Sequence, residues 1–318
     1  MTEAKKEHYK SLDGIRGLSA IGIIMMHVQS NVSYKLNGFI ADRLIPSFTD
    51  FTYLFMIISA FSLCCGYYED FQNETVSLEK FYKRRYQRIW PFFAFLCTID
   101  FILEPSIKTL YQYLADISLA FGFIPDNNIE VVGVGWFLGT IFVFYMVFPF
   151  LCFWLKTKRR AWVAFATTVI LHLLSDIYFK GAQGRENFIY SSMFFMAGGL
   201  VFLYREEINE LMEKRSRWVI YLLLVFLLVL YYTVLYMSDY MSLTIFSVMC
   251  ICCLRHSNGG ILQNRPCLWI SSMSMEIYLC HMLAFRSIEK VHLLSLFGNG
   301  WASYLVTVLM TLFGACLA

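Results

Sequence analysis

Charged residues are scarce in this chain. Lysine, arginine, aspartate and glutamate make up only 15% of its 318 residues, and proline occurs six times. Soluble domains carry about 25% charged and about 45–50% apolar residues, whereas 58% of this chain is hydrophobic and its mean hydropathy is +0.57. One soluble core could not bury so many apolar side chains. The shortage of charge therefore excludes an ordinary soluble protein and favours a chain whose outer face lies in a bilayer.

The sequence also lacks the cysteine spacing of a metal site. No two Cys-x-x-Cys pairs stand at metal-site spacing, and the crowded cysteines argue against a disulfide framework. We expect the thiols to act as small buried hydrophobes: Cys64, Cys65, Cys97, Cys152, Cys250, Cys252, Cys253, Cys267, Cys280 and Cys316. No small-residue cleavage site follows the first apolar run, so we expect no cleaved signal peptide. We expect no bound metal and no bound cofactor.

Ten hydrophobic runs are candidates to cross a bilayer, which takes roughly 17–25 residues each, or a little fewer where anchoring residues flank the run. They lie near residues 15–33, 48–67, 89–106, 133–155, 161–179, 188–204, 217–237, 240–254, 267–286 and 301–318. Residues 109–124 are apolar too, but they are short and interrupted by Asp116, which indicates a re-entrant or interfacial segment. The sequence therefore predicts an all-α, polytopic integral membrane protein, with a single transmembrane domain over residues 1–318 and no soluble domain.

The basic residues predict the orientation of these spans. If the ten spans alternate and the N-terminus is cytoplasmic, nineteen of the 26 lysines and arginines fall on the cytoplasmic side. This bias satisfies the positive-inside rule. Counting 109–124 as a further span would place the later basic clusters outside. We therefore expect both termini in the cytoplasm.

The first span carries an arginine and a histidine on one face. Arg16 and His27 are eleven residues apart, close to three helical turns, so they share a wall and are separated by roughly 16 Å along the axis. Arg16 would lie at the cytoplasmic mouth and His27 near mid-membrane, where a polar side chain indicates function by default. A neutral imidazole at that depth can act as a general base. The alternative stays open: His27 satisfied by an interhelical hydrogen bond, and Arg16 a topology anchor.

Several stretches resemble the acyltransferase 3 family, in the same order along the chain. The opening SLDGIRGLSAIGIIMMHV has Asp-Gly-x-Arg-Gly followed by a histidine, which Asp13, Gly14, Arg16, Gly17 and His27 supply. The stretches LFMIISAFSL (54–63), FYKRRYQRIWPFF (81–93), GWFLGTIFVFYMVFPFL (135–151) and SMSMEIYLCHMLAF (272–285) resemble the later family motifs. Together they cover essentially the whole chain.

The resemblance implies a membrane-bound O-acetyltransferase of the kind that modifies bacterial polysaccharides. Acyl-CoA would arrive from the cytoplasm as the acyl donor, and a hydroxyl of a cell-envelope sugar or exopolysaccharide would accept the acyl group. His27 would then be the general base, and Arg16 would hold the donor or stabilise the oxyanion. The resemblance also implies substrate-binding roles for the remaining motif residues, Asp13, Arg85, Arg88, Trp136, Tyr145 and His281.

These residues also have structural interpretations. Arg85 and Arg88 suit the phosphates of CoA, but they would equally mark topology or contact anionic lipid. His281 lines the tunnel or, more simply, bonds a neighbouring helix. Trp136 and Tyr145 would pack or line the cavity rather than react.

Two departures from the family pattern concern carboxylates. Where some relatives carry an acidic residue, this chain has Tyr53 in the second run and Ile141 in the fourth. If such a carboxylate orients the catalytic histidine in relatives, another group must do so here. The competing function is a transporter or flippase of a glycan or lipid-linked precursor, which favours repeated halves and broken helices. The two halves of the sequence show no self-similarity. In either case we expect a multi-pass protein of the bacterial inner membrane, working with separate glycan-biosynthesis proteins.

Overall fold

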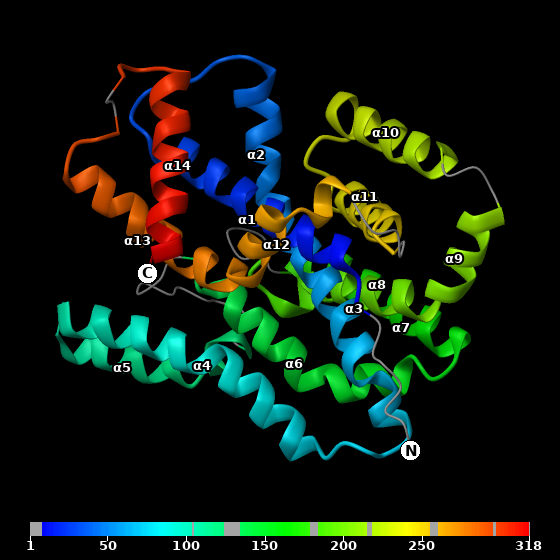
Figure 1. Ribbon diagram of the computed structural model, residues 1–318. Coiled ribbons are helices and arrows are strands. Elements are labelled where there is room, and N and C mark those ends of the chain that lie inside the picture. The colour runs from blue at the N-terminus through cyan, green and yellow to red at the C-terminus, as the bar shows by residue number, and fades with distance from the viewer. Residues whose placement is uncertain are drawn as a thin grey trace. The chain divides into compact units, whose positions relative to one another are not determined.

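The computed structural model describes residues 8–103, 105–123, 134–178, 184–214, 218–254, 260–294 and 297–317, and most of these residues are in helices. No strand occurs in these ranges (Figure 1). The first part contains α1 (Lys10–Asn31), the π-helical η1 (Ile40–Leu44), α2 (Ile45–Ser47), the 3₁₀ turn η2 (Phe48–Asp50) and α3 (Phe51–Gln72). The prediction of an all-α protein is confirmed for the described residues.

The rest of the chain continues in the same way. The middle part holds α4 (Leu78–Leu103), α5 (Ile107–Ile117), η3 (Ala120–Phe123), α6 (Trp136–Trp154), α7 (Lys158–Tyr178), α8 (Phe188–Leu203) and α9 (Arg205–Lys214). The last part holds α10 (Trp218–Thr233), α11 (Asp239–Cys252), η4 (Ile261–Gln263), α12 (Arg265–Ser272), α13 (Ser274–Lys290) and α14 (Trp301–Leu317). Each of the ten predicted spans overlaps one or more of these helices.

Length and composition single out fewer membrane crossings than the sequence predicts. Two helical stretches, Ile40–Gln72 and Trp136–Trp154, are long and apolar enough to cross a membrane among the described residues, or up to four if each of two bent helix pairs is one span. The helices α10, α11 and α14 are apolar but shorter. Ten spans with both termini in the cytoplasm therefore stay a prediction.

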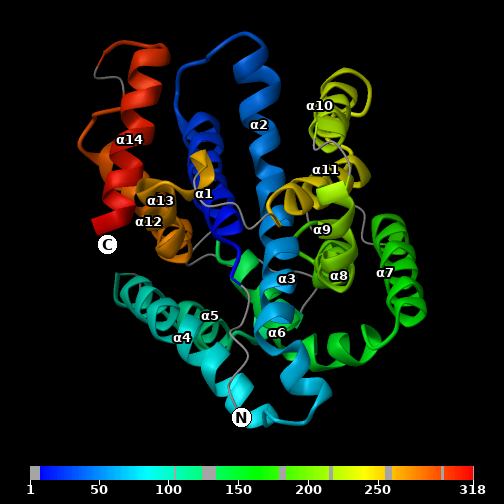
Figure 2. The same ribbon diagram turned by 45° about the vertical axis from the view of Figure 1, so that its right-hand side comes forward.

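One predicted span is broken in the structure. The run at 267–286 forms α12 and α13, which meet at a bend of 77°. The break falls at Met273, between two serines, and neither proline nor glycine marks it in the sequence. The segment predicted at 109–124 forms α5, which begins with a capping box between Ser106 and Thr109 and runs alongside α4 (Figures 1 and 2).

The chain forms two compact units. One, the terminal unit, contains Tyr9–Phe55 and Arg217–Ala318, and the other, the central unit, contains Met56–Ser216. The prediction of a single domain over residues 1–318 stays a prediction.

In the terminal unit, α1 is the central helix. It contacts α12, α13 and α14, and α13 packs along α14. A Cβ added at Gly14 would lie 1.7 Å from the carbonyl oxygen of Leu262, and one added at Gly17 would lie 2.7 Å from that of Cys267. Both approaches are closer than any side chain allows. The two glycines of the Asp-Gly-x-Arg-Gly motif thus form a seat for the 262–267 segment, which we call the glycine seat.

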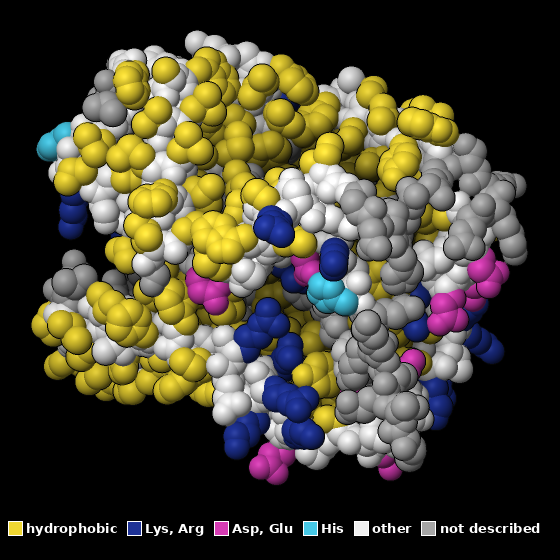
Figure 3. Space-filling model, viewed as in Figure 1, with side chains coloured by type: hydrophobic (Ala, Val, Ile, Leu, Met, Phe, Trp, Pro, Cys, Tyr) yellow, Lys and Arg dark blue, Asp and Glu magenta, His cyan; other side chains and the backbone are white. Residues whose placement is uncertain are grey.

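In the central unit, α7 packs along α8, and α6 contacts both. Gly198 of α8 faces the backbone of α3, because a Cβ there would lie 2.1 Å from the carbonyl oxygen of Ile57. Gly198 therefore lets α8 and α3 approach closely. Dark blue side chains in Figure 3 gather where Figure 1 shows the first half of α4, which carries the exposed cations Lys80, Lys83, Arg84 and Arg88.

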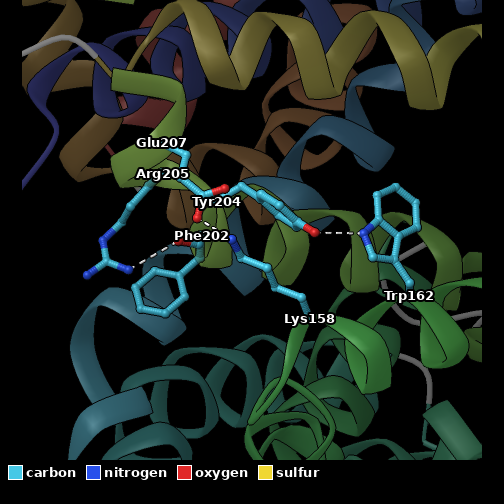
Figure 4. Close-up of polar contacts among 6 residues, drawn as sticks. All are labelled: Lys158, Trp162, Phe202, Tyr204, Arg205 and Glu207. Carbon is cyan, nitrogen blue, oxygen red and sulfur yellow. Dashed lines mark hydrogen bonds and ion pairs between the residues drawn. The ribbon is translucent and has the colours of Figure 1, made fainter. Parts of the chain in front are cut away.

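The bend of 62° between α8 and α9 is surrounded by polar contacts (Figure 4). The indole of Trp162 donates to the hydroxyl of Tyr204 over 2.9 Å, and Arg205 Nη1 donates to the carbonyl oxygen of Phe202 over 3.1 Å. Lys158 donates to Glu207, and this hydrogen bond raises the pKa of the Lys158 ammonium. The contacts of Trp162 and Lys158 tie the start of α7 to the start of α9.

Candidate active site

The unbroken helix α1 carries both residues predicted for catalysis. Because Lys10–Asn31 is one regular helix, Arg16 and His27 lie about three turns apart on one wall, as predicted. Arg16 is partly buried and forms an ion pair with Asp13, with 3.3 Å between Nη1 and Oδ1. Asp13 and Arg16 flank Gly14, so the glycine seat and this ion pair occupy the same turn of α1.

The structure brings His27 together with His281. Their ring centroids are 5.0 Å apart, and the ring planes are tilted by 45°. His281 lies on α13, only 1% exposed. Its Nδ1 is 2.7 Å from the carbonyl oxygen of Tyr278, one helical turn earlier. Its Nε2 is buried and has no hydrogen-bond partner among the described residues. Two histidines from opposite ends of the sequence thus form one polar pair inside the terminal unit.

Arg85 forms a second polar cluster, in the central unit. Its Nη2 donates to the hydroxyl of Tyr67 over 3.0 Å, and its guanidinium carbon lies 5.1 Å from the Tyr67 ring centre and 5.8 Å from that of Tyr145. The Nε of Arg85 is buried and has no partner in the described part of the chain. A guanidinium between two aromatic rings with one unused N–H is suited to an anionic group.

Two predicted substrate-binding residues lie outside this cluster. Arg88 is one turn further along α4 and exposed, while Trp136 is the first residue of α6 and is partly exposed. The Trp136 ring packs edge-on against Phe137 at 5.8 Å. No hydrogen bond or ring contact joins either residue to Arg85 in the residues that the structure describes. Their binding roles stay predictions, as do the roles of the other predicted site residues.

Sequence reasoning missed a buried acidic cluster in the terminal unit. Asp50 is 2% exposed, and its Oδ2 accepts hydrogen bonds from Tyr231 Oη at 3.0 Å and Ser242 Oγ at 2.8 Å. The neighbouring Tyr232 and Ser47 hydroxyls are 2.8 Å apart. An aspartate at the start of an apolar run and three tyrosines within residues 231–236 were the available signals.

Other polar residues have local structural roles. His172 Nδ1 lies 2.9 Å from the carbonyl oxygen of Tyr190, a hydrogen bond that joins α7 to α8. All ten cysteines are free thiols. No group of three or more histidine, cysteine, aspartate or glutamate side chains in the described ranges could hold a metal ion.

Comparison with known proteins gives one match. Residues 9–318 match the acyltransferase 3 family, described as an acyltransferase domain. No curated protein and no solved structure matches the chain significantly. The match covers essentially the whole sequence, including the histidine pair and the Arg85 cluster. The chain therefore belongs to the acyltransferase 3 family, whose members transfer acyl groups, and its apolar helices indicate a membrane protein.

Proposed function

We propose that the protein is a multi-pass O-acyltransferase of the bacterial plasma membrane. It takes an acyl group, in the first instance acetyl, from cytoplasmic acyl-CoA and passes it to a hydroxyl of a cell-envelope sugar or exopolysaccharide. The observation that carries this proposal is the pair formed by His27 and the buried His281 inside a largely apolar unit. A polar pair in such surroundings needs a reaction or a ligand to account for it.

The chemistry needs one base and one cation. His27 accepts the proton of the attacking hydroxyl as its oxygen bonds to the thioester carbonyl carbon. Arg16 holds the donor or stabilises the negative charge on the carbonyl oxygen. When the tetrahedral intermediate collapses, the carbon–sulfur bond breaks and the CoA sulfur takes the proton back from the His27 imidazolium. The products are an O-acyl ester and free CoA, and His27 is neutral again.

The Arg85 cluster supports an anionic donor. Its unused, buried Nε–H and the Tyr67 and Tyr145 rings around it suit a phosphate group of CoA, which accepts charge-assisted hydrogen bonds. Replacing Arg85 by Gln should raise the KM for acetyl-CoA about ten- to a hundredfold, since one such bond contributes about 1.5–3 kcal/mol. The matched control is Lys83→Gln, an exposed cation on the same helix. Equal KM values for the two variants would show that Arg85 does not bind the donor.

The function is tested by following the acyl group. Proteoliposomes containing the full chain would receive radiolabelled acetyl-CoA on one side, with glycan extracts of the host cells on the other. Mass spectrometry of surface glycans from cells with and without the gene would identify the acyl group and the acceptor. We expect labelled ester on a glycan only when the protein is present. Glycans of identical mass in both cell types would contradict the proposal.

A transporter is the second candidate, and one structural observation favours it. The bent pairs α8–α9 and α12–α13 are the kind of broken helices that build transport sites. Membership of an acyltransferase family weighs against transport without chemistry. The same proteoliposomes separate the two functions, because a transporter moves the glycan across the membrane without changing its mass.

A further inference from the structure

The hydrogen bond to Tyr278 fixes the proton on one nitrogen of His281. A carbonyl oxygen can only accept, so the His281 Nδ1 that lies 2.7 Å from it must carry the hydrogen. A neutral imidazole has one N–H, and the other nitrogen is then an acceptor with a free lone pair. The Nε2 of His281 is therefore an acceptor, held in place by its own helix.

This acceptor is buried without a donor. His281 is 1% exposed, and Nε2 has no hydrogen-bond partner among the residues described. Buried polar atoms in native proteins are nearly always paired, so an unpaired one calls for an explanation. The ring of His27, with its centroid 5.0 Å away, is close enough for facing imidazole nitrogens to form a hydrogen bond.

We propose that His281 is a positioning residue that accepts the ring N–H of His27 and thereby directs the other, unprotonated His27 nitrogen at the acceptor hydroxyl. This inference rests on the proposed function of His27 as the base. In the structure the rings are tilted by 45°, and a turn of the His27 ring would bring its N–H to the Nε2 of His281. The buried Nε2 of His281, which has no hydrogen-bond partner among the described residues and lies on a ring next to His27, is the feature that points to this role.

The proposal also explains how this chain can work without two carboxylates that some relatives carry. Tyr53 and Ile141, which stand at the expected acidic positions, are both buried and neither has a carboxylate. A carboxylate would orient a histidine well, but in an apolar interior its charge is costly to bury. A neutral imidazole acceptor orients the same N–H without that charge. When His27 takes up the hydroxyl proton, its N–H becomes a stronger donor and the bond to His281 strengthens.

The tautomer of His27 tests this role directly. Full-length protein labelled with ¹⁵N-histidine would be placed in lipid nanodiscs, and the His27 signals identified by their loss in His27→Asn. We expect His27 to be a single tautomer in the wild-type protein and a mixture of both in His281→Phe, which keeps the ring shape and removes the acceptor. His281→Gln, whose amide oxygen can accept, should restore a single tautomer in part. If His281→Phe leaves the tautomer of His27 unchanged, the proposal is wrong.

Kinetics supply the second readout. We expect His281→Phe to lower kcat about ten- to a hundredfold with the KM for acetyl-CoA unchanged, and His281→Gln to recover part of that loss. A purely structural histidine would lower the folded fraction of both variants alike and leave the tautomer of the remaining folded protein as it is. The NMR result needs no turnover. A wild-type protein that transfers no acetyl group therefore overturns the proposed function, whereas an unchanged tautomer in His281→Phe overturns this inference alone.

Discussion

Two polar clusters are buried in the terminal unit, and they differ in how fully their hydrogen bonds are made. Around Asp50, the hydroxyls of Tyr231 and Ser242 both donate to one carboxylate oxygen, and the ring of Tyr231 packs against its neighbours at 5.0 and 5.7 Å. At the His27–His281 pair, one ring nitrogen is left without a donor. Both clusters lie at α1: His27 is part of this helix, and η2, which ends at Asp50, packs against it.

The difference indicates different uses of buried polarity. A network whose donors and acceptors are paired makes the helices rigid and specifies how they pack. A network with an open acceptor costs stability and is retained where a substrate or a moving proton completes it. We therefore expect the Asp50 cluster to serve the fold and the histidine pair to serve the proposed chemistry. Substitutions in the Asp50 cluster should lower stability and leave activity unchanged, whereas substitutions in the histidine pair should lower activity and leave stability nearly unchanged.

The largest effect is expected at His27. His27→Asn removes the proposed base, and acetyl transfer should fall by roughly 10²–10⁴-fold. The thermal midpoint in detergent should stay near that of the wild-type protein, because the ring is only partly buried. Labelled acetyl transfer and a thermal melt of the same preparation measure both quantities. A variant that keeps full transfer would remove the distinction between the two clusters.

A methyl group at Gly14 should lower stability and activity together. Its Cβ would lie 1.7 Å from the Leu262 carbonyl oxygen, so α1 must shift, at a cost of about 1–3 kcal/mol for overpacking, and the shift moves His27 on the same helix. Gly66→Ala is the matched control, because its Cβ would meet nothing within 4 Å and alanine favours a helix. If Gly14→Ala melts at the temperature of Gly66→Ala, the glycine seat does not position α1.

The smallest effect is expected at Tyr231. Tyr231→Phe removes one donor to Asp50 and should lower the free energy of unfolding by about 1 kcal/mol, the usual size of such bonds between membrane helices. Acetyl transfer per folded molecule should not change. Tyr221→Phe, on the exposed side of α10 (41% exposed), controls for the loss of a hydroxyl. A loss of transfer in Tyr231→Phe without a loss of stability would place the Asp50 cluster in the chemistry.

Much of the fold could be predicted from the sequence, because apolar runs and their charged flanks report directly on helices. The ten predicted spans overlap helices, and the re-entrant or interfacial placement of residues 109–124, which form α5 and η3 over the described residues, stays a prediction. The break at Met273 could not be predicted, since its residues are acceptable in a helix and only packing decides the bend. Local sequence likewise holds no information on how many of the shorter helices cross the bilayer.

The sequence predicts how site residues are arranged along one helix, but not which residues of separate helices lie close together. Periodicity places Arg16 and His27 on one wall, because both lie on α1. The approach of His281 to His27, and of Tyr67 to Arg85, depends on how separate helices pack. The Asp50 cluster joins residues 181 and 192 positions apart, a separation at which a single sequence offers no pairing signal.

The glycine seat has a consequence for how related sequences are interpreted. Gly14 and Gly17 admit the backbone of a neighbouring segment, so they serve the packing of α1, whereas the role that we propose for His27 is in the reaction. A descendant that lost the histidine and kept both glycines would still assemble, and its sequence would still be recognised by the opening motif. The residues that make a chain recognisable as a family member and the residue proposed as the base are therefore different positions of one helix. The histidine has to be checked before an activity is assigned to any chain with the same opening motif.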